Sequence, residues 1–126
     1  PQEVEYIQVE PIIFKNQTVL QQFEKICGKN IILNCANFLD KKIKNEFIEY
    51  LNSKKLNITF FISKKNIFEE YCEILFPWMD KCYDFCKNKG LLNGYNSRLP
   101  AFLMERFVSF WIDRKVKRKS YLYETN

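Results

Sequence analysis

The sequence predicts a helix-dominated α+β fold with about five helices and two or three short strands. Between residues 66 and 86, apolar residues recur at helical spacing for about five turns, the strongest periodic signal in the chain. Three glycines and four prolines among 126 residues are few for an all-β protein. Residues 3–14 and 58–63 are rich in β-branched or aromatic residues and predict short strands. The length is that of one domain, so we expect residues 1–126 to fold as a single unit.

The first third of the chain is expected to contain strand and then helix. Residues 3–14 alternate in part between apolar and polar, and Pro11 interrupts them. Thr18 is a candidate N-cap for the helix that follows, and Gly28 is its stop signal. Residues 30–39 fit either a helix or a buried strand, and we prefer the helix.

A third helix is predicted after Asp40, which is a candidate N-cap. The apolar residues from Ile43 to Leu51 lie on one face of this segment, and lysines occupy the other. Residues 52–55 then form a loop into the predicted strand 58–63.

The longest predicted helix begins near Asn66, its candidate N-cap. Pro77 lies inside the pattern and predicts a kink, or two helices that meet near Phe76. Helical spacing favours the core for the aromatic side chains of this segment, and the alternative is a surface that stacks on a sugar. These side chains are Phe68, Tyr71, Phe76, Trp78 and Tyr83.

The last predicted helix starts at Pro100, after a loop over residues 90–98. Most of its residues are apolar, and Trp111 is expected to share one core with Trp78 of the preceding helix. Glu105 and Arg106 are two charges within this apolar segment, and such charges are rarely buried unless they are paired. The basic run at residues 114–119 follows and most simply forms a solvated tail.

Composition excludes several classes of function. The chain has no histidine, which excludes Ser-His and Cys-His catalysis and leaves the five cysteines without the usual zinc co-ligand. No CxxC pair occurs, so we expect reduced thiols in a cytoplasmic protein, with Cys82 and Cys86 facing the core. A net charge of +5 suits an anionic partner, but no nucleic-acid recognition motif accompanies it. We predict no metal and no cofactor, and no apolar run is long enough to span a membrane.

Three ordered motifs resemble a bacterial family. They are Phe60-Phe61-Ile62-Ser63-Lys64-Lys65, then Phe68-x-x-Tyr71-Cys72-x-x-Leu75-Phe76, and finally Tyr95-x-x-Arg98-x-x-x-Phe102-Leu103-x-Glu105-Arg106. The family is the domain of unknown function found in capsular-polysaccharide and lipopolysaccharide glycosyltransferases. This chain departs from the family pattern at three positions, where Thr59, Ile74 and Ala101 replace an asparagine, a tryptophan and a glycine. The family's N-terminal half is absent, and the chain begins with Pro1, so we expect the C-terminal part of a longer glycosyltransferase.

The resemblance implies a transfer of sugar from a nucleotide-sugar donor to a glycan acceptor. It implies Glu105 as the catalytic base and a substrate-binding role for Tyr95, Arg98, Arg106 and Thr59. The chemistry of the residues leaves a second interpretation open, in which Glu105 and Arg98 form a buried structural ion pair. If the three charges line a cleft, we expect Glu105 to pair with Arg98 and Arg106 to stay free for an anion. A non-catalytic module for interaction or for acceptor positioning is the alternative function.

Membrane attachment is a further expectation from the resemblance. Transferases of this kind meet lipid-linked acceptors at the inner face of the membrane. The basic run could dock there on anionic lipid. Its cations are Arg114, Lys115, Lys117, Arg118 and Lys119.

Overall fold

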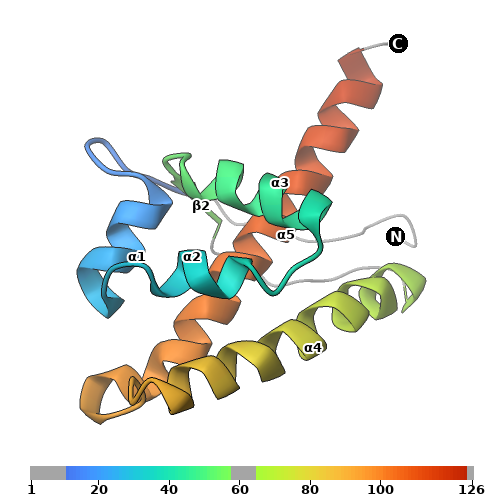
Figure 1. Cartoon of the computed structure of the whole chain (residues 1–126). Coiled ribbons are helices and arrows are strands. Elements are labelled where there is room, and N and C mark those ends of the chain that lie inside the picture. Colours follow the sequence, from blue (N-terminus) through green and yellow to red (C-terminus); the bar gives the residue numbers. More distant parts are fainter. Residues whose placement is uncertain (1–10, 58–64, 125–126) are drawn as a thin grey trace.

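The computed structural model describes residues 11–57 and 65–124, and for residues 65–68, 95 and 115–124 it describes the backbone alone. Within these ranges the chain forms five α-helices, one 3-10 helix and one pair of short strands (Figure 1). This confirms the helix-dominated α+β class. The elements are β1 (Ile12–Ile13), α1 (Val19–Cys27), α2 (Ile31–Ala36), α3 (Lys41–Leu51), β2 (Lys55–Leu56), α4 (Lys65–Asn88), η1 (Gly94–Arg98) and α5 (Leu99–Glu124).

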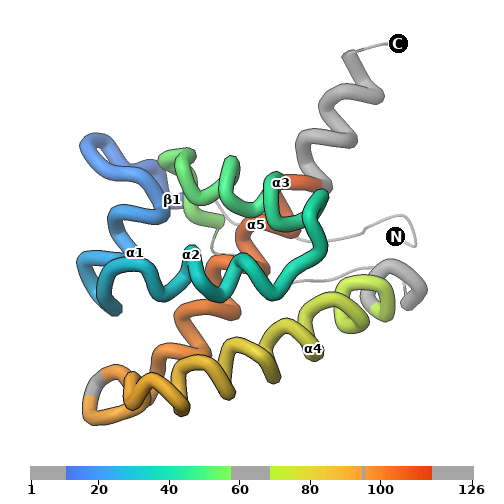
Figure 2. The backbone as a smooth tube through the Cα atoms, in the orientation of Figure 1, coloured from blue at the N-terminus to red at the C-terminus, as the bar shows by residue number. Residues whose placement is uncertain are grey.

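The last helix, α5, is the central element of the fold. It contacts α1, α3 and α4, while α1, α2 and α3 pack on one another (Figure 1). The tube in Figure 2 shows α4 and α5 diverging from the connection between them. α5 therefore joins the three short helices to α4.

Two predicted N-caps start their helices as expected. The hydroxyl of Thr18 accepts a hydrogen bond from the N–H of Gln21 at 3.1 Å, and Oε1 of Gln21 accepts from the N–H of Thr18 at 2.9 Å. The carboxylate of Asp40 accepts from the N–H groups of Lys42 and Ile43 at 3.1 and 3.2 Å. Residues 31–36 form the helix that we preferred over a strand.

The two strands pair across a long stretch of chain. β1 is antiparallel to β2, with Ile12 opposite Leu56 and Ile13 opposite Lys55. The strand predicted over residues 58–63 lies outside the described residues. β2 therefore begins at Lys55, the last residue of the expected loop, and ends at Leu56, just before that segment.

α4 is one helix, and the predicted division near Phe76 is wrong. The helix runs from Lys65 to Asn88 through Pro77 (Figure 2). Asn66 consequently lies in the first turn and is not the N-cap. Proline removes one helical hydrogen bond, whereas packing of Leu75 and Trp78 holds the turns on both sides of it.

An aromatic cluster forms the centre of the core. The ring of Phe47 on α3 lies 5.8 Å from that of Trp78 on α4, and Trp78 lies 5.0 Å from Phe107 on α5. Phe107 in turn lies 6.1 Å from Trp111. The burial of both tryptophans confirms the expected core between the two long helices.

The other predictions for α4 are confirmed only in part. Cys82 and Cys86 are buried, as expected, and all five cysteines are free thiols. By contrast, Phe76 is 60% exposed and Tyr83 is 47% exposed, so the prediction that they lie in the core is wrong. Phe76 and Tyr83 are seven positions apart, which is close to two full helical turns, so both lie on one face of the helix. Trp78 and Cys82 lie on the other, buried face.

Candidate functional site

Three of the candidate site residues lie at the junction of η1 and α5. The 3-10 helix η1 ends at Arg98 and passes directly into α5, with Pro100 in the first turn where its missing N–H costs little. Arg98 is exposed, Glu105 is exposed and Arg106 is buried. This stretch therefore presents two charges at the surface and one inside the fold.

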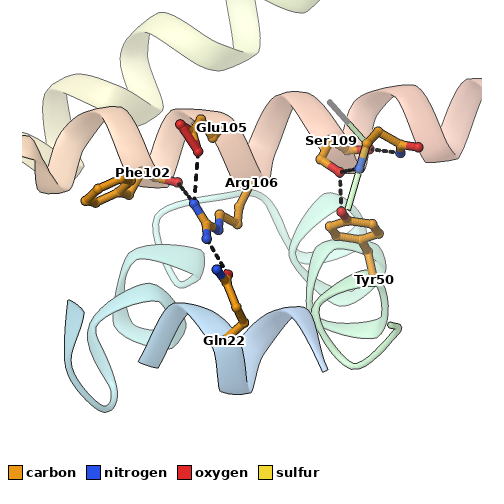
Figure 3. A network of polar contacts seen from close by, with 7 residues as sticks. Gln22, Tyr50, Phe102, Glu105, Arg106 and Ser109 are labelled. Carbon is orange, nitrogen blue, oxygen red and sulfur yellow. Dashed lines mark hydrogen bonds and ion pairs between the residues drawn. The ribbon is translucent and has the colours of Figure 1, made fainter. Parts of the chain in front are cut away.

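Arg106 is enclosed between α5 and α1 (Figure 3). Only 3% of the residue is exposed, and its Nη2 donates a hydrogen bond to Oε1 of Gln22. Its Nη1 donates to Oε1 of Glu105 at 3.1 Å and to the carbonyl oxygen of Phe102 at 3.4 Å. The guanidinium also lies over the ring of Phe23, at 5.4 Å from the centroid.

The environment of Arg106 has two opposing effects on its charge. Burial lowers the pKa of the guanidinium from its ordinary value, and the Glu105 carboxylate works in the opposite direction. Arginine stays protonated in proteins even so. Arg106 is therefore a cation whose two terminal nitrogens donate to partners within the protein, while its buried Nε has no hydrogen-bond partner among the described residues.

Two expectations about this cluster are wrong. Glu105 pairs with its neighbour Arg106 and not with Arg98, and Arg106 is not free for an anion. The guanidinium of Arg98 instead lies over the ring of Phe102, 6.0 Å from the centroid. The long side chain of Arg106 places its Nη2 at Gln22 and its Nη1 within reach of the carboxylate of Glu105, the preceding residue.

Glu105 keeps a surface position despite this ion pair. Its side chain is 58% exposed, and Oε1 is the atom that Arg106 holds. The carboxylate is thus fixed on one side by a buried cation and open to solvent on the other. Such a group can accept a proton or a hydroxyl hydrogen bond from a bound molecule.

Arg98 at the end of η1 and Arg106 on α5 both lie over the ring of Phe102, and Glu105 joins this group through Arg106. It does not test the other two site predictions. The backbone of Tyr95 is in η1, but its side chain is not described, and Thr59 lies outside the described residues.

A second buried polar group, on α5 one turn further along, was not predicted from the sequence. The N–H of Asn57 donates to Oγ of Ser109 at 2.7 Å, and the amide of Asn57 donates to the carbonyl oxygen of Ser109 at 2.9 Å. The hydroxyl of Tyr50 donates to the carbonyl oxygen of Lys55 at 2.9 Å, so the hydroxyl of Ser109 donates to Tyr50 (Figure 3). The network ties β2 and its following residue to α5.

The sequence signal for these residues was weak. Ser109 is one small polar residue among apolar neighbours, a pattern that a solvated position would also give. Gln22, the partner of Arg106, lies on a helix with several polar residues. Only the three-dimensional packing shows which of them is directed inward.

The basic run does not begin as a solvated tail. Nε of Arg114 lies 2.9 Å from Oε2 of Glu46 on α3, and only 14% of its side chain is exposed. Its guanidinium also lies over Trp111, at 5.1 Å from the ring centroid. The prediction of solvation is wrong for Arg114, and the side chains of Lys115, Lys117, Arg118 and Lys119 are not described.

Among the described residues, no cluster of cysteine and carboxylate side chains has the geometry of a metal site. The helices in these parts of the chain also include none with the length and apolar character required to cross a bilayer.

Comparison with protein families gives one match. Residues 2–117 match the model of a family described as a domain of unknown function (DUF4422). No curated protein and no solved structure matches the chain. The matched region includes β1, all of α1 to α4, and α5 up to Lys117, with every candidate site residue. The chain therefore belongs to the DUF4422 family.

Proposed function

We propose that the chain is part of a glycosyltransferase that acts in the biosynthesis of capsular polysaccharide or lipopolysaccharide. In this proposal a sugar passes from a nucleotide-sugar donor to a glycan acceptor. The three ordered sequence motifs support it, because they resemble those of the domain found in such enzymes. Residues of the third motif lie together on η1 and the first turns of α5.

The observation that carries the proposal is the surface carboxylate of Glu105, held by the buried cation of Arg106. Glycosyl transfer requires that an acceptor hydroxyl lose its proton as its oxygen attacks the anomeric carbon. In our proposal Glu105 accepts that proton while the bond from the anomeric carbon to the nucleotide diphosphate breaks. The diphosphate leaves with the bonding electron pair.

The arginines have different parts in this proposal. Arg106 is a positioning residue, because its donors fix the carboxylate and its buried head cannot reach a substrate. Arg98 is exposed at the end of η1 and supplies the positive charge that a diphosphate requires. Tyr95 and Thr59 remain candidate substrate-binding residues from the resemblance alone.

Glu105→Gln tests the catalytic step. The substitution preserves shape and removes the base, so we expect sugar transfer by the longer natural protein to fall about a hundred- to ten-thousand-fold. The matched control is Glu49→Gln, an exposed carboxylate on α3 that should leave transfer unchanged. Glu49→Gln should unfold at the wild-type temperature, whereas Glu105→Gln keeps an acceptor for Arg106 but loses the ionic attraction, so transfer is compared per folded molecule. Full transfer by a folded Glu105→Gln variant would remove Glu105 from the mechanism.

In this proposal the purified chain of residues 1–126 does not transfer sugar by itself, because donor binding belongs to another part of the longer protein. Transfer by this chain with a nucleotide-sugar donor and an acceptor would contradict that expectation.

A non-catalytic, acceptor-positioning module is the second candidate function. The observation in its favour is that Arg106 serves the contact between α5 and α1. Loss of acceptor binding without loss of the chemical step, in a Glu105→Gln variant of the longer protein, would support this candidate over the first.

A further inference from the structure

The outward face of α4 has a shallow, open hollow, called the α4 groove below, and all of its described lining residues belong to this one helix. It has a volume of about 500 Å³ and lies on a helix that forms one edge of the molecule (Figure 1). Phe76, at 60% exposure, is the largest side chain in it. The described residues that line this α4 groove are Glu69, Cys72, Glu73, Phe76 and Pro77.

Pro77 leaves one backbone acceptor of α4 without its helical donor. Pro77 has no N–H, so residue 77 cannot bond to the carbonyl oxygen of Glu73 one turn earlier. The lining residues therefore combine the apolar surface of Phe76 and Pro77 with the carboxylates of Glu69 and Glu73. All of these polar atoms are acceptors, and no cationic side chain is among the described lining residues.

We propose that the α4 groove binds a neutral saccharide of the acceptor glycan. A pyranose ring has an apolar C–H face, which can stack on Phe76, and hydroxyl groups, which can donate to the oxygens of Glu73 and Glu69. The inference deepens the proposed function and rests on it for the identity of the ligand. It explains why the most exposed aromatic ring among the described residues lies beside hydrogen-bond acceptors.

A second aromatic ring extends the same face. Tyr83 is 47% exposed and lies seven residues beyond Phe76, which places it about 10.5 Å further along the helix axis. The distance exceeds the width of one sugar ring, so the two rings would contact different units of a chain. An oligosaccharide should therefore bind more tightly than the corresponding monosaccharide.

A basic peptide is the main rival ligand, since residues 69–84 carry five carboxylates and one lysine. Such an acidic surface attracts cations. However, ion pairs between exposed side chains contribute at most about 1 kcal/mol. The apolar surface of Phe76 and Pro77 also offers no hydrogen-bond acceptor to an ammonium group, whereas the C–H face of a sugar can pack against it. Binding of a neutral saccharide should hardly depend on salt, while binding of a basic peptide should weaken steeply.

Binding to immobilised oligosaccharides tests the proposal without any transfer reaction. The probes are tetrasaccharides of glucose, galactose and N-acetylglucosamine, each with its monosaccharide, and a lysine hexapeptide, all measured at low and high salt. Phe76→Ala should weaken tetrasaccharide binding about tenfold or more, equal to about 1.4 kcal/mol. Phe76→Trp should retain binding because it keeps an aromatic face. The matched control is Ile26→Ala, which truncates an exposed apolar side chain on α1 and should change nothing.

The outcomes separate this proposal from the proposed function. Salt-independent tetrasaccharide binding that is lost in Phe76→Ala and kept in Phe76→Trp supports the groove as a saccharide site. No binding to any tetrasaccharide, or salt-sensitive binding to the lysine peptide alone, overturns it. Sugar transfer by the longer protein that survives Phe76→Ala but not Glu105→Gln would leave the proposed function intact and remove the groove from it.

Discussion

Arg106 on α5 and Gln22 on α1 are joined by a hydrogen bond inside the fold, with Nη2 as the donor and Oε1 as the acceptor. The two residues are 84 positions apart in the sequence. This bond ties the helix that carries Glu105 to the first helix of the chain. Arg106 therefore holds α5 against α1, a structural role that the sequence pair Glu105-Arg106 did not indicate.

Gln22→Ala should therefore lower the free energy of unfolding by about 1.5–3 kcal/mol, since a buried charged donor loses its partner. Denaturant unfolding measures this directly. Lys25→Ala, an exposed change on the same helix, should stay within about 0.5 kcal/mol of the wild type. If Gln22→Ala costs as much in an Arg106→Met background as in the wild type, the two side chains are not coupled.

Trp111→Ala should cost about 3–5 kcal/mol, because the indole is fully buried against the rings of Phe107 and Tyr71. Thermal or denaturant unfolding would report the loss. Phe76→Ala, which removes an aromatic ring of which 60% is exposed, should cost much less. A loss below about 1 kcal/mol for Trp111→Ala would place α5 outside the core.

The thiols should differ in their reactivity in the native protein. A side-chain hydrogen bond with Cys82 raises the pKa of Cys35 to about 12, and a side-chain hydrogen bond with Cys35 raises the pKa of Cys86. Burial raises the pKa of Cys27. An aromatic disulfide reagent should thus modify the half-buried Cys72 first, because thiolates react and buried thiols do not.

Mass spectrometry of the labelled peptides would identify the first site, and unfolded, unreduced protein should then react at all five cysteines. Fewer than five reactive thiols after unfolding would mean that a disulfide exists. Rapid labelling of Cys35 or Cys86 in the native state would contradict their burial.

Alkaline pH should destabilise the fold through Tyr50. Burial raises the pKa of its hydroxyl from 10.0 to about 12. Between these values the unfolded chain releases the proton and the folded chain keeps it, so the stabilising contribution is complete below pH 10 and is lost as the pH rises to 12. The loss is about 2–3 kcal/mol.

Tyr50→Phe isolates this effect. The variant lacks the hydrogen bond to Lys55 and should be less stable than the wild type near neutral pH. Its stability should then fall less steeply above pH 10. Parallel curves for the two proteins, measured by denaturant unfolding from neutral pH to pH 12, would show that Tyr50 does not titrate with unfolding.

Local rules were sufficient to predict most of the helices. Thr18 and Asp40 were identified as N-caps because their side chains act within three residues of themselves. The same locality explains two errors. Pro77 acts locally as a helix breaker, yet packing of both halves of α4 outweighs the one lost bond. Asn66 has the chemistry of an N-cap but already lies inside the first turn of the helix, which begins at Lys65.

The sequence identified which residues form the candidate site, but it did not identify the partners of their side chains. Glu105 and Arg106 were recognised as unusual charges within an apolar helix. Their pairing depends on where the guanidinium of Arg106 finds its second acceptor, and that acceptor is on α1. Sequence spacing along one helix contains no information about Gln22, which is why the expected pair with Arg98 was wrong.

The short strands have a consequence for how the molecule opens. β1 and β2 are two residues each and bracket α1, α2 and α3. Few backbone hydrogen bonds join the two strands and the residues beside them, and one of these bonds runs from the N–H of Phe14 to the carbonyl oxygen of Lys54 at 2.8 Å. Because both residues of β1 are exposed, we expect their detachment to cost little buried surface and to be a low-energy, sub-global opening that leaves the three helices folded. Amide hydrogens at Phe14 then exchange with solvent through that opening, while those around the buried Phe107 exchange only when the whole chain unfolds.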